Sequence, residues 1–506
     1  MIRAILSCLA ALSGMLLGAA PVQLHIKATA YPRQQATLYR YMDLFTQRTE
    51  AIAEGWTDAN GAVQLTAEVD GTQKARLRIG KVAADLWLRE GAYHIEMPAA
   101  PTDQPPGING TARVQPTFTD LDPLDINALV ADLNTRLDAF LAAGLATDRN
   151  TGMDALAKAR KDGTALKPDT SKTADRPLLS PTWNEARTDT FARKLRKFYA
   201  AVPDPWFQAD LEYGIAGLYL GPQTRDRDLY DHFLKGKPVL YGVPEYVRFF
   251  TSLFKDPLLG GPFRTRPDDV LRFIREGSTD SLKALLAAND LLKEDRLNEL
   301  ALLYDLYTNQ GNALFDRDGI IRVIGDVQDR SRYPEHRLIA ADMLWDLTAM
   351  MGGTLLPPME LTRPDGNAMH LDSLLQGPSC LLVVKPGNPY TDQELAALAQ
   401  LRKDYGGHVR FLCIALDRSP QELGAWLKAN PQYGGSWAVP ANPRALLDDW
   451  RISSVPAAFL LDGRILARAP APLPGNGLAA ELHKLKVAGQ RADQLKPDRG
   501  QPPPRR

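Results

Sequence analysis

Few of the residue types that carry out chemistry are grouped in this sequence. The seven histidines are scattered, and no His-x-x-x-His or Cys/His cluster indicates a zinc site. Neither a Gly-x-Ser-x-Gly nucleophile elbow nor a phosphate-binding loop is present. His232 and His336 lie near apolar residues and are interpreted as structural. We therefore expect no metal and no cofactor, and the cysteines remain as the candidates for chemistry.

The three cysteines are Cys8, Cys380 and Cys413. Cys8 lies in an N-terminal apolar run, with too little apolar sequence before it for a lipoprotein box. Cys380 begins one apolar run of strand length and Cys413 lies within another. Cysteines in buried strands behave as small hydrophobic residues, and a disulfide between these two strands is geometrically awkward. The sequence favours two inert thiols, with a disulfide as the alternative.

The two apolar runs that hold these cysteines flank a helical pattern. Residues 381–384 and 409–416 are continuous apolar strands, and Leu395, Leu398 and Leu401 form one stripe of the segment between them. Strand, helix and strand in this order predict a βαβ unit with a buried parallel sheet. Further helices follow, and a third apolar strand begins after Val455-Pro456.

This order resembles the thioredoxin fold, specifically the exported thiol-disulfide reductases related to the cytochrome-maturation thioredoxins. Residues 454–462 match the family pattern Val-x-x-Pro-Thr-x-Phe-Leu-Ile-Asp, with alanine in place of threonine. Pro456 stands where the family has a cis-proline that faces its redox site. The resemblance covers residues 353–486.

The family's Cys-x-x-Cys pair is missing from this sequence. Its two positions fall on Asn388 and Thr391, with Pro389 and Tyr390 between them. Disulfide exchange needs a thiolate that attacks and a second thiol that resolves the mixed disulfide, and an amide and a hydroxyl supply neither. Asn388 and Thr391, like Asp392, are ordinary helix-capping residues.

A second interpretation is that these residues line a groove that still binds a ligand but does not reduce it. In the family, the backbone beside the cis-proline pairs with an extended substrate segment, a form of β-addition. The resemblance then implies a peptide groove lined by Asn388, Pro389, Tyr390, Thr391, Val455 and Pro456.

The N-terminus is predicted to be a secretory signal peptide. Met1-Ile2-Arg3 precedes an apolar run that ends in small residues near Ala19 and Ala20. No other segment approaches the roughly 20 apolar residues that span a bilayer. We expect an exported, periplasmic protein with no lipid anchor and no transmembrane segment after cleavage.

The predicted fold class is multidomain α+β. After the signal peptide (1–20), period-two alternation predicts a β-sandwich over 21–116, a helical region follows over 117–352, and a polar excursion is expected near 151–181. The thioredoxin-like domain spans 353–486, and 487–506 is a disordered tail. The sandwich and the helical insert resemble those of exported Bacteroidetes-type proteins with thioredoxin-like domains.

Charge and motifs together favour a binding protein. Lys plus Arg and Asp plus Glu both number 60, and this balance argues against a nucleic-acid partner. We expect a redox-inactive binding or assembly module, with an extended peptide or another exported protein as partner. The alternative is a thiol-disulfide oxidoreductase that uses Cys380 or Cys413, or a site formed by residues far apart in the sequence; whether the protein is an enzyme stays open.

Overall fold

The computed structural model describes residues 20–101, 111–161, 185–221, 224–375, 377–452 and 454–494. The chain divides into two compact units, Met1–Met343 and Leu344–Arg506. The expected signal peptide lies outside the described residues except for Ala20, where the first strand begins. None of the described helices is long and apolar enough to cross a membrane.

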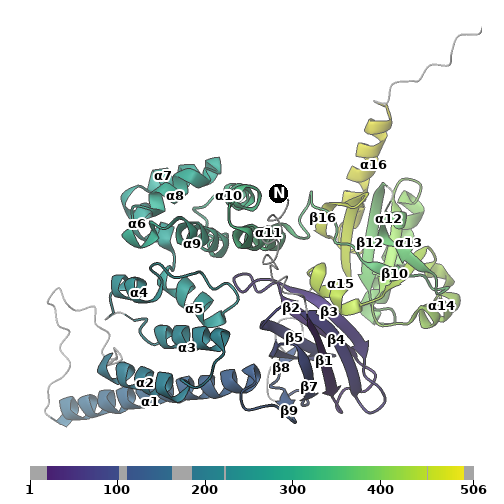
Figure 1. Ribbon diagram of the computed structural model, residues 1–506. Coiled ribbons are helices and arrows are strands. Elements are labelled where there is room, and N and C mark those ends of the chain that lie inside the picture. Colours follow the sequence, from purple (N-terminus) through teal and green to yellow (C-terminus); the bar gives the residue numbers. More distant parts are fainter. Residues whose placement is uncertain are drawn as a thin grey trace, which may run out of the picture. The chain divides into compact units, whose positions relative to one another are not determined.

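The first unit begins with two β-sheets (Figure 1). One has the strand order β4-β1-β7-β9 and the other β3-β2-β5-β6-β8. The strands are β1 Ala20–Lys27, β2 Gln35–Tyr41, β3 Thr49–Trp56, β4 Ala62–Val69, β5 Gln73–Ile79, β6 Val82–Leu88, β7 Gly91–Glu96, β8 Ala112–Arg113 and β9 Thr117–Phe118.

The two sheets enclose one apolar core. Val22, Leu24 and Ile26 of β1 are buried in it together with alternate residues of the other strands. The residues between them, among them His25 and Lys27, lie on the opposite face of the sheet. The alternation that the sequence predicts is therefore present, and it leaves one polar face on this sheet.

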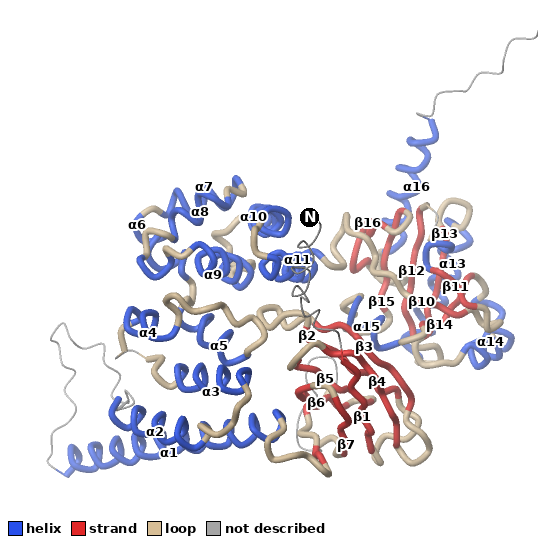
Figure 2. The backbone as a smooth tube through the Cα atoms, in the orientation of Figure 1, coloured by secondary structure: helices blue, strands red, loops and turns tan. Residues whose placement is uncertain are grey.

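The rest of the first unit is helical (Figure 2). The helices are α1 Ile126–Lys161, α2 Glu185–Phe198, α3 Pro205–Gly217, α4 Asp226–Phe233, α5 Pro244–Leu253, α6 Pro257–Thr265, α7 Pro267–Glu276, α8 Thr279–Leu286, η2 Asp290–Leu292, α9 Asp295–Thr308, α10 Arg317–Arg330 and α11 Pro334–Thr348, the last of which continues past Met343 into the second unit. Helix α1 includes the first residues of the polar segment predicted over 151–181, because this part is rich in alanine, leucine and lysine, which favour helices. The remainder of that segment lies outside the described residues.

Asp210 on α3 is a buried acid in this helical part. Its side chain is 3% exposed, and its Oδ1 accepts one long hydrogen bond, 3.4 Å, from the main-chain N–H of Glu245. Burial and the nearby charge of Glu245 raise the pKa of Asp210 to about 7. Between the ordinary aspartate pKa of about 4 and this value, the folded state binds more protons than the unfolded state. The contribution of Asp210 to the free energy of unfolding therefore decreases as the pH rises from about 4 to about 7.

Asp210→Asn should remove this pH dependence. At about pH 8, we expect the free energy of unfolding of the variant to exceed that of the wild type by on the order of 2–4 kcal/mol. At about pH 4, the two free energies should be almost equal. Urea unfolding of the full chain at both pH values measures this. The control, Asp329→Asn, changes an exposed residue of α10 and should shift neither value. A difference of equal size at both pH values would contradict the assignment.

The second unit contains one seven-stranded sheet with the order β11-β10-β14-β13-β12-β15-β16. Its strands are β10 Glu360–Thr362, β11 Ala368–His370, β12 Pro378–Val384, β13 Arg410–Ala415, β14 Ser436–Pro440, β15 Ala457–Asp462 and β16 Ile465–Ala471. Its helices are α12 Leu371–Leu374, α13 Pro389–Tyr405, α14 Pro420–Ala429, η3 Pro431–Tyr433, α15 Pro443–Asp449 and α16 Leu478–Gln494.

The pairing of these strands gives a thioredoxin-like fold. The central strand β12 runs parallel to β13 and antiparallel to β15, and β15 runs antiparallel to β16. Helix α13 connects β12 to β13, and α16 follows β16. This is the strand–helix–strand order that the sequence predicts, completed by two antiparallel strands and a last helix.

Strand β12 is buried on both faces. Leu381 and Val383 pack into one apolar cluster with Trp450, while Cys380 and Leu382 pack into another on the opposite face. A strand covered on both sides needs apolar residues at successive positions. This explains why the sequence here is a continuous apolar run.

Helix α16 continues into the segment predicted to be a disordered tail, 487–506. It ends at Gln494, so the prediction is wrong for its first residues. Leu478 and Leu482 are buried against the sheet and anchor the helix. Alanine, lysine, arginine and glutamine then extend it, because they have high helix propensity. Residues 495–506 lie outside the described residues.

Candidate functional site

The turn between β12 and α13 is held by its own polar groups. Gly387 has φ +91°, a conformation that glycine adopts without a steric cost. The Oδ1 atom of Asn388 caps α13 by accepting the main-chain N–H of Tyr390 at 3.0 Å. Asp392 accepts the N–H of Gly387 at 3.1 Å. Pro389 takes the first helical position, where its missing N–H has no cost.

Thr391 does not cap the helix. Because Asn388 is the cap, Thr391 is the third helical residue, and its side chain is only 2% exposed. The prediction of a helix-capping residue is therefore confirmed for Asn388 and wrong for Thr391. Tyr390, in contrast, is 54% exposed. The two positions that the sequence resemblance assigns to the cysteine pair, Asn388 and Thr391, thus hold an amide cap and a buried hydroxyl.

Arg418, which the sequence did not single out, fixes the same turn from outside. It precedes α14, and its Nη2 donates to the main-chain carbonyl of Pro386 at 3.0 Å. Its guanidinium group lies 5.6 Å from the centre of the Trp426 ring. A cation over an aromatic face is stabilised by the ring quadrupole. The loop is therefore tied to the helix that follows β13.

Pro456 lies at the same end of the sheet as this turn. The Val455–Pro456 peptide bond is cis, and Pro456 is buried. The next residue, Ala457, pairs with Val383, one residue before the end of β12. Because β12 and β15 run antiparallel, the end of one and the start of the other meet at one edge. The fold therefore brings Val455 and Pro456 to the end of the sheet where the Asn388 turn begins.

Cys380 and Cys413 lie inside the sheet, away from that edge. They are 1% and 5% exposed, and both are free thiols in the same apolar cluster. Burial raises the pKa of Cys413 to about 12 and raises that of Cys380 still further. The void beside Cys413 has a volume of about 10 Å³, enough for no more than one water molecule. Neither thiol is placed to meet a disulfide substrate.

Comparison with known proteins gives weak similarities only. No family model matches the chain, and no curated protein matches it. A solved structure of a putative thiol-disulfide oxidoreductase from Bacteroides vulgatus is 20% identical, with 27% of this chain and 99% of that chain covered and a TM-score of 0.26. A thioredoxin-like protein from Bacteroides caccae is 14% identical, with coverage of 53% and 94% and a TM-score of 0.26.

A thiol peroxidase from Chromobacterium violaceum is 16% identical, with 28% of this chain and 88% of that chain covered and a TM-score of 0.24. Because these identities and TM-scores are low, the assignment of a thioredoxin-like fold rests on the strand order and connectivity of the second unit.

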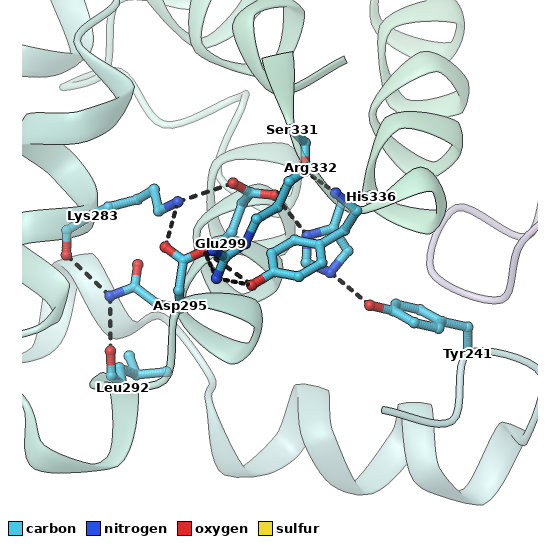
Figure 3. Close-up of polar contacts among 10 residues, drawn as sticks. Tyr241, Lys283, Leu292, Asp295, Glu299, Ser331, Arg332 and His336 are labelled. Carbon is cyan, nitrogen blue, oxygen red and sulfur yellow. Dashed lines mark hydrogen bonds and ion pairs between the residues drawn. The ribbon is translucent and has the colours of Figure 1, made fainter. Parts of the chain in front are cut away.

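A buried polar network in the helical part of the first unit was not found from the sequence (Figure 3). His336 of α11 is fully buried, and its Nδ1 lies 2.8 Å from Oε1 of Glu299 on α9. Its Nε2 lies 2.7 Å from the hydroxyl of Tyr241, which also accepts a hydrogen bond of 2.9 Å from Nε of Arg296.

Glu299 is the centre of this network. Its Oε1 also accepts the hydroxyl of Ser331, and its Oε2 lies 3.0 Å from the ammonium of Lys283. Burial raises the pKa of Glu299, but the hydrogen bonds from His336 and Ser331 and the charge of Lys283 outweigh it and hold the pKa at about 2. Since both carboxylate oxygens are occupied within the protein, we assign the network a stabilising role. The full burial of His336 and its two polar partners agree with the structural interpretation, which stays a prediction.

Proposed function

We propose that this protein is a redox-inactive thioredoxin-like binding module that takes up an extended peptide segment at the edge formed by the Asn388 turn and Val455–Pro456. The residues at that edge give this proposal its most direct support. The positions of the family's cysteine pair hold a helix cap, Asn388, and a buried hydroxyl, Thr391. Neither group can attack or resolve a disulfide.

The main chain at Val455 supports the binding half of the proposal. It precedes β15, and in the described part of the chain no main-chain hydrogen bond joins it to another residue. A main-chain N–H and C=O that are left open beside a sheet can pair with an added strand. Tyr390, largely exposed at the same end, offers an aromatic contact to a side chain of that strand.

The alternative function, a thiol-disulfide oxidoreductase that uses Cys380 or Cys413, is disfavoured by burial. A reactive cysteine needs a lowered pKa and access to solvent, and burial raises the pKa of both thiols. Export through the predicted signal peptide and a periplasmic location belong to the same proposal. If the protein is exported in this way, its partner is an extended segment of another exported protein.

The test uses Tyr390→Ala and a control at the other end of the same sheet. The control residue is Ile465, which is 49% exposed. It pairs with Asp462, and Asp462 pairs with Pro378 at the start of β12. Ile465 therefore lies at the end of the sheet opposite to the turn that contains Asn388. Random peptides displayed on phage are selected on the full chain from Ala20. We expect the enriched peptides to bind Ile465→Ala as tightly as the wild type and Tyr390→Ala about tenfold or more weakly.

Either of two results would overturn the proposed function. One is the absence of any enriched peptide. The other is enriched peptides that bind Tyr390→Ala as tightly as the wild type, which would place the binding surface away from this edge. Circular dichroism of both variants checks that the fold is kept, as the exposure of the two side chains leads us to expect.

A further inference from the structure

A groove of about 440 Å³ lies on the polar face of the β4-β1-β7-β9 sheet. Its lining includes His25 and Lys27 of β1, Gln64 of β4, and His94 and Glu96 of β7. His25 pairs with Gln64 on one side and with His94 on the other, so these three side chains form one row across three strands. Ligand sites in proteins commonly have volumes of about 300–1,000 Å³.

The two histidines form a pair within this row. Their ring centres are 4.8 Å apart and the rings are nearly parallel, with an interplanar angle of 19°. The Nδ1 atom of His94 lies 2.8 Å from Oδ2 of Asp120, which follows β9. No described residue hydrogen-bonds to Nε2 of His94 or to the ring of His25. Two imidazoles thus present unused nitrogen atoms to one groove.

We propose that His25 and His94 bind a divalent transition-metal ion, Zn²⁺ or Cu²⁺, in this groove. Imidazole nitrogen is a preferred ligand of both ions, and each bond needs a separation of about 2.0–2.1 Å. Asp120 holds His94 through the nitrogen that does not bind the metal, the arrangement in which a carboxylate orients a metal-binding histidine. Because the two rings are stacked, the His25 ring must turn about its side-chain torsions before its nitrogen can reach the same ion, and no described hydrogen bond to the ring opposes this movement.

The charges around the groove favour a metal over an anionic ligand. Lys27, the one lysine of the lining, is paired with Glu96 at 3.1 Å. Over the described ranges, no group of three or more His, Cys, Asp or Glu side chains is arranged around a common metal position. The ion would therefore have two protein ligands and keep open positions for water. This inference does not depend on the proposed peptide binding, because it concerns a different sheet.

The experiment titrates Cu²⁺ and Zn²⁺ into the metal-free full chain from Ala20, with calorimetry for affinity and electron paramagnetic resonance for the Cu²⁺ ligands. We expect one site per chain and a Cu²⁺ spectrum with splitting from two nitrogens. His25→Gln and His94→Gln should each weaken binding by about tenfold or more and remove one nitrogen from the spectrum. Asp120→Asn should weaken binding by about tenfold while both nitrogens remain.

His232→Gln is the matched control, because His232 is exposed on α4 of the same unit. It should leave both affinity and spectrum unchanged. Binding that survives in the His25→Gln/His94→Gln double variant would overturn the proposal, and so would a wild-type chain that binds neither ion. Circular dichroism of the double variant separates loss of the ligands from loss of the fold.

Discussion

Replacing Glu299 by alanine is expected to lower the free energy of unfolding of the first unit by about 3–5 kcal/mol. Glu299 is 5% exposed, and its carboxylate accepts hydrogen bonds from three side chains, Ser331, His336 and Lys283. Truncation leaves the fully buried ring of His336 without its carboxylate partner, and a buried polar group that loses its partner bears the whole cost of desolvation. Urea unfolding of the full chain, followed by circular dichroism, measures the loss.

The pH dependence gives the same prediction an independent check. The pKa of Glu299 is held at about 2 in the folded protein, below the unfolded value of about 4.3. A carboxylate with a lowered pKa stabilises the fold above its unfolded pKa and loses that contribution as the pH falls through the folded pKa. The difference between wild type and Glu299→Ala should therefore be full at about pH 6 and shrink steadily from about pH 4 to about pH 2.

An exposed ion pair provides the control. Glu212 pairs with Arg196 at 2.7 Å, and both side chains are more than a third exposed. Surface pairs of this kind contribute about 0–1 kcal/mol, so Glu212→Ala should have a small effect. If Glu299→Ala were no more destabilising than Glu212→Ala, or if its effect did not depend on pH, the central role of Glu299 in the network would be wrong.

The second large effect is expected for the thiols. In the folded protein, Cys380 and Cys413 should react with Ellman's reagent on the order of a thousandfold more slowly than an exposed cysteine at about pH 8. With the pKa of Cys413 near 12, only about one thiol in ten thousand is ionised at that pH, against about a quarter for an ordinary cysteine. Because the thiolate is the reacting form, the rate falls in proportion.

Unfolding supplies the internal control for this measurement. In guanidinium chloride the chain from Ala20 should titrate two thiols rapidly, Cys380 and Cys413. A parallel insulin-reduction assay with dithiothreitol should show no acceleration above background. One fast thiol in the folded chain, or acceleration that disappears in a Cys380→Ser/Cys413→Ser variant, would instead favour the oxidoreductase alternative.

The sequence by itself determined those features that depend on short-range patterns. The apolar run of β12 follows from burial on both faces, and the alternation of β1 follows from burial on one. Asn388 before Pro389 is a local signal for a helix start, and Asn388 caps α13. In each case the signal can be read from a few consecutive residues of the chain, although the residues that bury the strands are distant.

Only the tertiary structure decided which distant residues meet. Glu299, His336 and Tyr241 come from α9, α11 and the loop before α5, and no spacing in the sequence marks them as partners. His25 and His94 share a groove because the sheet places β1 beside β7. Helix packing and strand pairing join segments across long stretches of chain. Polar clusters built from such segments have no periodic or local signature by which a single sequence could reveal them.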